Sequence, residues 1–293
     1  MSNFNLGTGY GVLDRIGAGS GNKLFVGPVG YPGYTELFQS IIPDPMGKLR
    51  LHSTIQEAVD AADAGDTIYV VPGSYDESVV ISTANVTVVG LGGRGSVFIE
   101  PSTAGAEGLQ VTADDVTLVN IGVDGDDTAT YSLNLNAVSR FRAYGCKFEL
   151  GSGAAPVVLI DGTATDQTAD ALFDDCEFAW STRGIMFDDS AYGYPTQIFI
   201  QNSRFHNLSG ICIGENASGG VVNLEVTNCV FDNMEDGTAP TDYVVIDRAG
   251  DTGIFSGNRF ATATNSSAVL TIAAGIFWVA NATEAGWSTA RPA

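Results

Sequence analysis

A short strand pattern that recurs through the middle of the chain constrains the fold more than any other feature. Each copy has alternating apolar residues, then Gly, Asp or Asn, then a small residue, any residue and a closing phenylalanine. The closing residues are spaced 30, 27, 26 and 29 positions apart: Phe148, Phe178, Phe205, Phe231 and Phe260. An irregular period of this size, with one short strand pattern in each copy, is typical of a solenoid.

The repeat also extends towards the N-terminus, because residues 86–91 match residues 116–121, and a second apolar strand follows each copy. Strands this short bury little surface alone. Stacked in register at a spacing of about 4.8 Å, they bury one face and pair both edges. We therefore predict an all-β fold, a single-stranded parallel β-helix, over residues 51–275.

One position in each copy is predicted to point into the core, directly after the Gly, Asp or Asn that makes the bend. Residues of several kinds occupy it: Ile121, Cys146, Cys176, Ser203, Cys229 and Asn258. The cysteines at this position are therefore expected to be small buried packing groups. They are not expected to be nucleophiles or disulfide partners.

The composition limits the partners. The chain of 293 residues has 44% hydrophobic residues, enough for a packed interior, and a net charge of −21. A surface this acidic repels phosphate backbones and anionic membranes, so neither nucleic acid nor membrane is expected as a partner. The N-terminus lacks the pattern of a signal peptide, and no run of 18 apolar residues is present, so synthesis in a reducing cytoplasm is expected.

No metal or cofactor is expected. The four cysteines form no C-x-x-C pair, and His52 and His206 are the only histidines in the sequence. Residues 124–127 lack the spacing of an EF-hand loop and are interpreted as a turn, with a loosely bound calcium as the alternative. His206 directly follows Phe205, so it is predicted to point away from the interior, at a surface or an interface.

Residues 1–50 are rich in glycine and proline and are predicted to form an extended docking arm that packs on another molecule. Its apolar side chains are the candidate docking residues: Leu24, Phe25, Tyr31, Tyr34, Leu37 and Phe38. Residues 276–293 are predicted to be a C-terminal cap, since their aromatic residues must either plug the last coil or meet a partner chain.

A helix is predicted over residues 54–64, with a capping box formed by Thr54 and Glu57. This helix and the following residues 65–81 resemble the entry helix and first coil of the pectin-lyase-like right-handed β-helix superfamily. The resemblance covers roughly residues 50–275 and implies a right-handed parallel β-helix with an N-terminal capping helix. It does not select a function, because lyases, esterases and structural proteins share this entry.

Residues 34–50 resemble a leader found in tailed-bacteriophage virion proteins of this fold. This second resemblance implies a virion structural protein, such as a capsid decoration protein or a head fibre, assembled in the host cytoplasm. Its N-terminal arm would bind the major capsid protein or another virion protein. A homotrimer is expected by analogy with spikes of this fold.

The acidic residues of the repeat are candidates for the catalytic residues of the superfamily. The resemblance implies calcium and a basic residue for lyases, and two aspartates with an arginine and a glutamine for esterases. Asp174, Asp175 and Glu177 form an acidic run, but no basic residue recurs beside them at a coil spacing, and Arg183 is the nearest. The sequence therefore predicts no catalytic residue and a protein that is not an enzyme. A tailspike-like polysaccharide depolymerase, lyase or hydrolase, or a glycan-binding adhesin, is the alternative.

A loop predicted over residues 188–195 contains the candidate glycan-binding residues. Asp188 and Asp189 carry carboxylates, and Tyr192 and Tyr194 carry rings that stack on sugars and hydroxyls that hydrogen-bond to them. The expected ligand is a host-surface glycan, with an ordinary insertion loop as the alternative.

Overall fold

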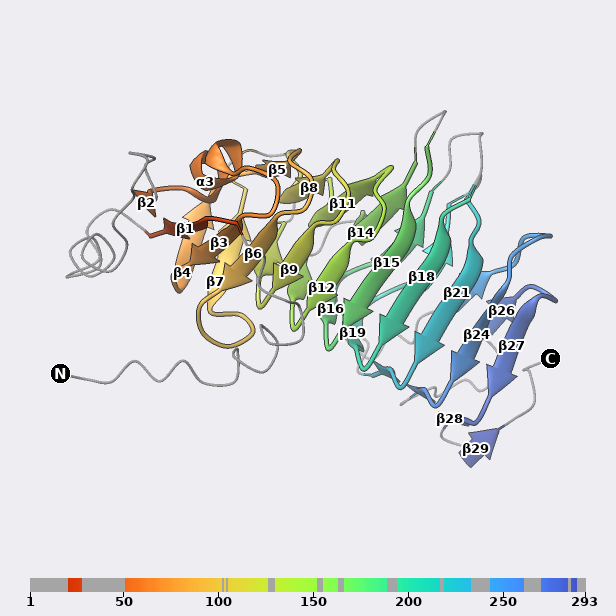
Figure 1. Cartoon of the computed structure of the whole chain (residues 1–293). Helices are drawn as coiled ribbons and strands as arrows, with labels where there is room; N and C mark the ends of the chain where they lie inside the picture. The colour runs from red at the N-terminus through yellow and green to blue at the C-terminus, as the bar shows by residue number, and fades with distance from the viewer. Residues whose placement is uncertain are drawn as a thin grey trace.

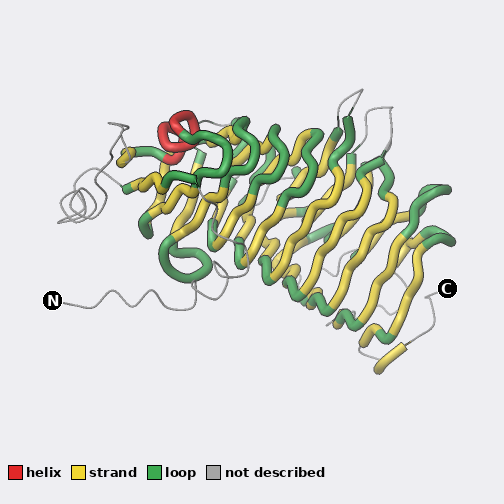
Figure 2. The backbone as a smooth tube through the Cα atoms, in the orientation of Figure 1, coloured by secondary structure: helices red, strands yellow, loops and turns green. Residues whose placement is uncertain are grey.

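The computed structural model describes residues 21–27, 51–101, 103, 105–125, 130–151, 155–162, 166–188, 194–216, 219–232, 243–260, 270–283 and 286–288. Within these ranges the chain is a parallel β-solenoid with three long sheets and a single short helix (Figures 1 and 2). The predicted all-β fold class is confirmed.

Sheet A has 11 strands in the order β2 (Leu51–His52), β1 (Lys23–Val26), β3 (Thr67–Val70), β6 (Thr87–Gly90), β9 (Thr117–Val119), β12 (Arg142–Tyr144), β15 (Ala169–Asp174), β18 (Thr196–Gln201), β21 (Val222–Thr227), β24 (Gly253–Ser256) and β27 (Ile276–Val279). Sheet B has 10 strands in the order β29 (Gly286–Ser288), β28 (Asn281–Thr283), β25 (Arg259–Phe260), β22 (Val230–Phe231), β19 (Arg204–Leu208), β16 (Glu177–Ser181), β13 (Lys147–Glu149), β10 (Gly122–Asp124), β7 (Val97–Glu100) and β4 (Gly73–Asp76). Sheet C has 8 strands in the order β26 (Leu270–Ile272), β23 (Val244–Ile246), β20 (Ile213–Glu215), β17 (Arg183–Phe187), β14 (Pro156–Asp161), β11 (Leu133–Asn136), β8 (Leu109–Val111) and β5 (Val79–Ile81).

Each coil contributes one strand to each sheet, and each strand pairs in parallel with its equivalents in the neighbouring coils. The pairing of β28 with β29 is antiparallel. Figure 1 shows the strands of sheet A side by side along the length of the molecule.

The phenylalanine ladder forms the centre of the core. Successive rings stack with centroids 5.8, 4.7, 4.8 and 4.5 Å apart, from Phe148 through Phe178, Phe205 and Phe231 to Phe260. All of these side chains are buried, as are the four free cysteines. The prediction that this repeat is a core ladder is confirmed.

The bend between sheet A and sheet B contains one left-handed residue in six of the coils. The residue before the inward position has a φ between 52° and 67° in six coils: Asn120, Gly145, Asp175, Asn202, Asn228 and Gly257. Glycine, asparagine and aspartate tolerate this conformation best, which explains their recurrence in the sequence.

The helix α3 (Ile55–Ala61) lies at the N-terminal end of the solenoid and is shorter than predicted (Figure 1). Thr54 Oγ1 accepts a hydrogen bond from Glu57 N at 3.1 Å, as the predicted capping box requires. Ile55, Ala58 and Val59 are buried against the first strands. Among the described residues no helix is long and apolar enough to span a membrane. The capping role of the helix remains a prediction.

Residues 23–26 of the predicted arm form β1, which pairs with both β2 and β3. Most of the remaining arm, residues 1–20 and 28–50, lies outside the described residues. At the other end, residues 276–279 form β27 and continue sheet A, with Ile276 and Trp278 buried and Phe277 70% exposed.

Replacing one central ring of the ladder should destabilise the protein strongly. Phe205→Ala removes a fully buried ring stacked on both sides, and we expect the free energy of unfolding to fall by about 3–5 kcal/mol. Denaturant unfolding followed by circular dichroism measures the change. Phe277→Ala is the matched control, expected to change stability by less than about 1 kcal/mol. Equal losses in the two variants would contradict the assignment of the ladder as the core.

Candidate functional site

The outer face of sheet A carries two rows of side chains set by the strand register. In one row, Arg142 is followed by Leu172, Phe199, Glu225, Ile254 and Phe277 on successive strands. In the other, Tyr144 is followed by Asp174, Gln201, Thr227, Ser256 and Val279. Val89 and Val119, which precede Tyr144 in the second row, are buried, so the open part of this face begins at β12.

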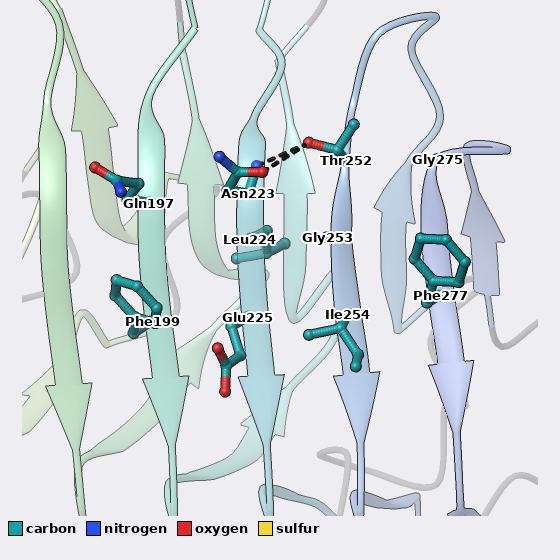
Figure 3. Close-up of a pocket in the computed structure, with 10 residues that line it drawn as sticks. All are labelled: Gln197, Phe199, Asn223, Leu224, Glu225, Thr252, Gly253, Ile254, Gly275 and Phe277. Carbon is teal, nitrogen blue, oxygen red and sulfur yellow. Dashed lines mark hydrogen bonds between the residues drawn. The ribbon is translucent and has the colours of Figure 1, made fainter.

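A groove of about 520 Å³ crosses strands β18, β21, β24 and β27 on this face (Figure 3). Figure 3 shows Phe199, Glu225, Ile254 and Phe277 side by side across the four strands. The groove is lined by Gln197, Phe199, Asn223, Leu224, Glu225, Thr252, Gly253, Ile254, Gly275 and Phe277. It therefore combines apolar rings and an aliphatic side chain with amide groups and one carboxylate.

Three consecutive strands have a left-handed residue at the same ladder position. Asp170, Gln197 and Asn223 have φ values of 54°, 57° and 59°, and they are aligned on β15, β18 and β21. A local irregularity of this kind interrupts the regular in–out alternation of a strand and changes the direction in which a side chain points. Just before β24 the aligned residue is Thr252, whose Oγ1 accepts a hydrogen bond from Asn223 N at 2.9 Å. The polar edge of the groove is thus built by a repeated backbone irregularity.

Two glycines at the C-terminal end of the groove allow neighbouring coils to approach closely. A Cβ atom on Gly253 would lie 2.2 Å from Leu224 O, and one on Gly275 would lie 2.2 Å from Asp251 O. Neither position can hold a side chain without moving the backbone of the neighbouring coil. The close approach of the coils therefore requires glycine at both positions.

A second group of polar residues lies where the open face begins, on β12 and β15. Arg142 Nη2 contacts Asp170 Oδ2 at 2.8 Å. Asp174 lies opposite Tyr144 on one side and Gln201 on the other, and its Oδ1 accepts a hydrogen bond from Asn202 Nδ2 at 2.8 Å. Burial raises the pKa of Tyr144; Arg142 opposes this rise and Asp174 adds to it.

Arginine, glutamine and two aspartates therefore occur together on adjacent strands of one face, although the sequence predicted no basic residue near the aspartates. Arg142, on the coil before β15, was missed because it aligns with Leu172 and not with Asp174, so it does not stand at a coil spacing from that aspartate. Aligning Phe148 with Phe178 would have placed Arg142 opposite Leu172 and Tyr144 opposite Asp174. Asp170 and Asp174 are four residues apart on one strand, about 13 Å between backbones, so they do not form a close pair.

Two of the predicted glycan-binding residues are described, and neither of them lines the groove. Asp188 Oδ2 accepts a hydrogen bond from Asn216 Nδ2 at 2.9 Å, just after β17. Tyr194 is three residues before Gln197, and its ring lies next to Gly220. Asp189 and Tyr192 are outside the described residues. Glycan binding by this set remains a prediction, and the groove residues were not among those predicted.

Of the six predicted docking residues, the structure describes two. Leu24 belongs to the hydrophobic core and is 1% exposed, while Phe25 is buried and stacks on Tyr69 with centroids 5.3 Å apart. These two side chains therefore pack within the chain itself. The other four lie outside the described residues: Tyr31, Tyr34, Leu37 and Phe38. Docking through the arm remains a prediction.

His206 lies on the outer face of sheet B, so it points away from the interior as predicted, but it is 9% exposed. Its Nε2 lies 2.7 Å from Glu177 Oε1, and Arg94 Nη1 lies 3.8 Å from Glu177 Oε2. The hydrogen bond from His206 lowers the pKa of Glu177. Among the described residues no group of three or more histidine, cysteine, aspartate or glutamate side chains is placed to hold a metal ion.

The inward position of β20 holds a carboxylate. Glu215 aligns with Phe187, which aligns with Ile160, and both of these are core residues. The Glu215 side chain is 2% exposed, and its Oε1 accepts a hydrogen bond from Asp247 N at 2.6 Å. Burial raises the pKa of Glu215 to about 7; the hydrogen bond from Asp247 N opposes this rise, and nearby Asp251 adds to it.

A comparison with solved structures finds this fold in pectin methylesterases and in a phage protein. The pectin methylesterase from Aspergillus niger is 18% identical over 94% of this chain and 89% of its own, with a TM-score of 0.57. PemA, the pectin methylesterase from Erwinia chrysanthemi, is 14% identical over 83% and 88%, with a TM-score of 0.55. ORF18 of Geobacillus virus E2 is 14% identical over 78% of this chain and 56% of its own, with a TM-score of 0.59. No family model and no curated protein matches the sequence.

These likenesses confirm the predicted pectin-lyase-like, right-handed parallel β-helix. They also overturn one prediction. The sequence predicted a protein that is not an enzyme, whereas several of the solved neighbours are pectin methylesterases. The prediction rested on the lack of a basic residue beside Asp174, Asp175 and Glu177, and Arg94, which contacts Asp175 and Glu177, removes that ground. The alternative, a protein that acts on a polysaccharide, is better supported.

The buried carboxylate of Glu215 gives a specific pH dependence. Its pKa is raised on folding, so the native state keeps a proton that the unfolded chain releases, and its contribution to stability is lost between pH 4.5 and about 7. Glu215→Gln keeps an acceptor for Asp247 N but cannot ionise. The free energy of unfolding of the variant, measured with denaturant, should rise by about 3 kcal/mol relative to that of the wild type when the pH is raised from 4 to 8. If the free energies of unfolding of variant and wild type differ by the same amount at both pH values, Glu215 ionises normally.

Proposed function

We propose that this chain binds a polysaccharide along the outer face of sheet A and hydrolyses it. The observation that carries this proposal is the groove across β18, β21, β24 and β27, in which a mostly apolar row of side chains runs along the solenoid axis beside a row of polar ones (Figure 3). A linear polymer fits a site that repeats from coil to coil, because equivalent contacts then recur at the strand spacing of about 4.8 Å.

The two kinds of side chain in the groove suit the two kinds of surface of a sugar. The rings of Phe199 and Phe277 offer flat apolar surfaces to the C–H faces of sugar rings. The amides of Gln197 and Asn223 each offer both donors and acceptors to hydroxyl groups. Both amide side chains belong to exposed residues and lie along one edge of the groove, where they can reach a bound chain.

Two carboxylates on the same face are the candidate acid and base. Glu225 lies on β21 and Asp174 on β15, two strands and two residues apart, or about 12 Å between backbones. Figure 3 shows the Glu225 carboxylate pointing towards the C-terminal ends of the strands, where the row of Asp174 lies. Side chains that lean together would approach the separation of about 6.5–9.5 Å at which two carboxyl groups admit a water molecule beside the scissile bond. Gln201 lies between them as a hydrogen-bond donor.

The setting that we propose is a phage particle. ORF18 of Geobacillus virus E2 has the same fold, and residues 34–50 resemble a phage virion leader. A protein of this kind would act as a tailspike-like depolymerase on a host-surface polysaccharide. Immunogold labelling of particles with an antibody against this chain should mark the virion, and unlabelled particles would contradict this part of the proposal.

Activity on polysaccharides tests the proposed reaction. The purified chain should release reducing ends from at least one bacterial surface polysaccharide, measured by a colorimetric assay. Glu225→Gln and Asp174→Asn should each lower kcat by about 100-fold or more, because each removes an acid or base. Phe199→Ala should raise KM more than it lowers kcat, since it removes a stacking surface. Glu100→Gln, a carboxylate change on sheet B, is the matched control and should leave the rate unchanged.

Release of methanol or acetate, without reducing ends, would show that the reaction is ester hydrolysis and not glycosidic hydrolysis. The active site would still lie on this face if the same variants abolish that release. Turnover that survives both carboxylate changes would exclude this face as the active site.

A further inference from the structure

The charges on the outer face of sheet A indicate the class of polysaccharide. We propose that the groove binds uncharged polysaccharides and excludes polyanionic ones such as polyuronates. This inference rests on the function proposed above and adds the substrate class to it.

The strands that carry the groove, with the neighbouring strand β15, lack positive charge. The five strands β15, β18, β21, β24 and β27 are fully described and contain no lysine, arginine or histidine. Their outward-facing residues include three carboxylates, Asp170, Asp174 and Glu225. The side chains of these five strands therefore offer a ligand only negative charge and neutral groups.

The nearest arginine on this face is already neutralised. Arg142 Nη2 contacts Asp170 Oδ2 at 2.8 Å, and Arg142 Nη1 donates to the carbonyl oxygens of Asp170 and Phe141. Its guanidinium is thus bound on two sides within the chain. A sugar carboxylate would have to displace Asp170 to reach it.

Three other basic residues carry partners on or beside sheet B. Arg94 pairs with Asp175, Lys147 Nζ lies 2.5 Å from Glu149 Oε1, and Arg204 Nε lies 3.1 Å from Asp232 Oδ1. These cations do not face the groove, so they cannot offset its charge.

A polyuronate would be doubly disfavoured in this groove. Proteins recognise carboxylates with arginine or lysine, whose charge-assisted hydrogen bonds replace the lost hydration, and the groove offers neither. A sugar carboxylate about 4 Å from Glu225 would also be repelled by about 1–4 kcal/mol, depending on exposure. The net charge of −21 adds a long-range repulsion of polyanions.

An uncharged chain meets no such penalty. The side chains of Phe199, Ile254 and Phe277 present apolar surface, and Phe277 is 70% exposed. Covering this surface with the C–H face of a neutral sugar removes it from water without burying a charge. Glu225 can accept hydrogen bonds from sugar hydroxyls, which a neutral chain supplies in abundance.

The test pairs neutral polysaccharides with charged derivatives that share the same backbone. Dextran, galactan, mannan and xylan are each compared with their carboxymethyl derivatives by affinity electrophoresis of the full chain. At about 20 mM salt, the neutral polymer that binds most tightly should have a dissociation constant at least about tenfold lower than that of its carboxymethyl derivative. This difference in affinity, the gap, should narrow at about 500 mM salt. Glu225→Gln should also narrow the gap, and Glu225→Lys should narrow it further or reverse it. Glu100→Gln on sheet B should leave it unchanged.

The outcomes separate this inference from the function on which it rests. Tighter binding of a carboxymethyl derivative than of its parent, weakened by salt and lost in Phe199→Ala, would overturn the charge inference and leave polysaccharide binding by the groove intact. Retention of no polymer of either kind would overturn the proposed function and this inference together.

Discussion

In-register pairing between equivalent strands of successive coils is the interaction on which the rest of the structure depends. Each strand has only two to six residues, so its own backbone hydrogen bonds and buried side chains could not hold it in place. Because each coil presents the same inward positions, the pairing of one strand brings the phenylalanines of neighbouring coils into stacking contact at 4.5–5.8 Å. Hydrogen bonding and ring stacking therefore select the same register.

The same register builds the outer face. A residue that points outward on one strand lies opposite the equivalent residue of the next coil, so side chains far apart in the sequence become neighbours along the axis. Phe199 and Phe277 face the same groove for this reason, although 77 residues separate them. Substitution of the outward residues costs little stability. The binding or catalytic side chains of this face can therefore vary while the buried phenylalanine ladder stays the same. The groove, its polar edge and its negative charge are all products of this arrangement.

The fold could be predicted because the inward pattern repeats in the sequence, whereas the site could be predicted only in part. The closing phenylalanines and the left-handed Gly, Asp and Asn residues identify the coils directly. The outward residues follow no repeat, so Phe199 and Glu225 resemble ordinary strand residues until their neighbours in space are known. Strand β1 was missed as part of the body because its partner β3 is 44 residues away, and local composition favoured an arm. Glu215 was missed because its strand appeared to end at Ile213.

The central claim is that a glycan lies along sheet A, and a crystal structure of the chain with a bound oligosaccharide tests it most directly. The account predicts a sugar chain parallel to the solenoid axis across β18, β21, β24 and β27, with one ring over Phe199 and hydroxyl groups bonded to Gln197 or Asn223. An oligosaccharide bound at sheet B, at sheet C or in the loops, with the groove on sheet A empty, would contradict it.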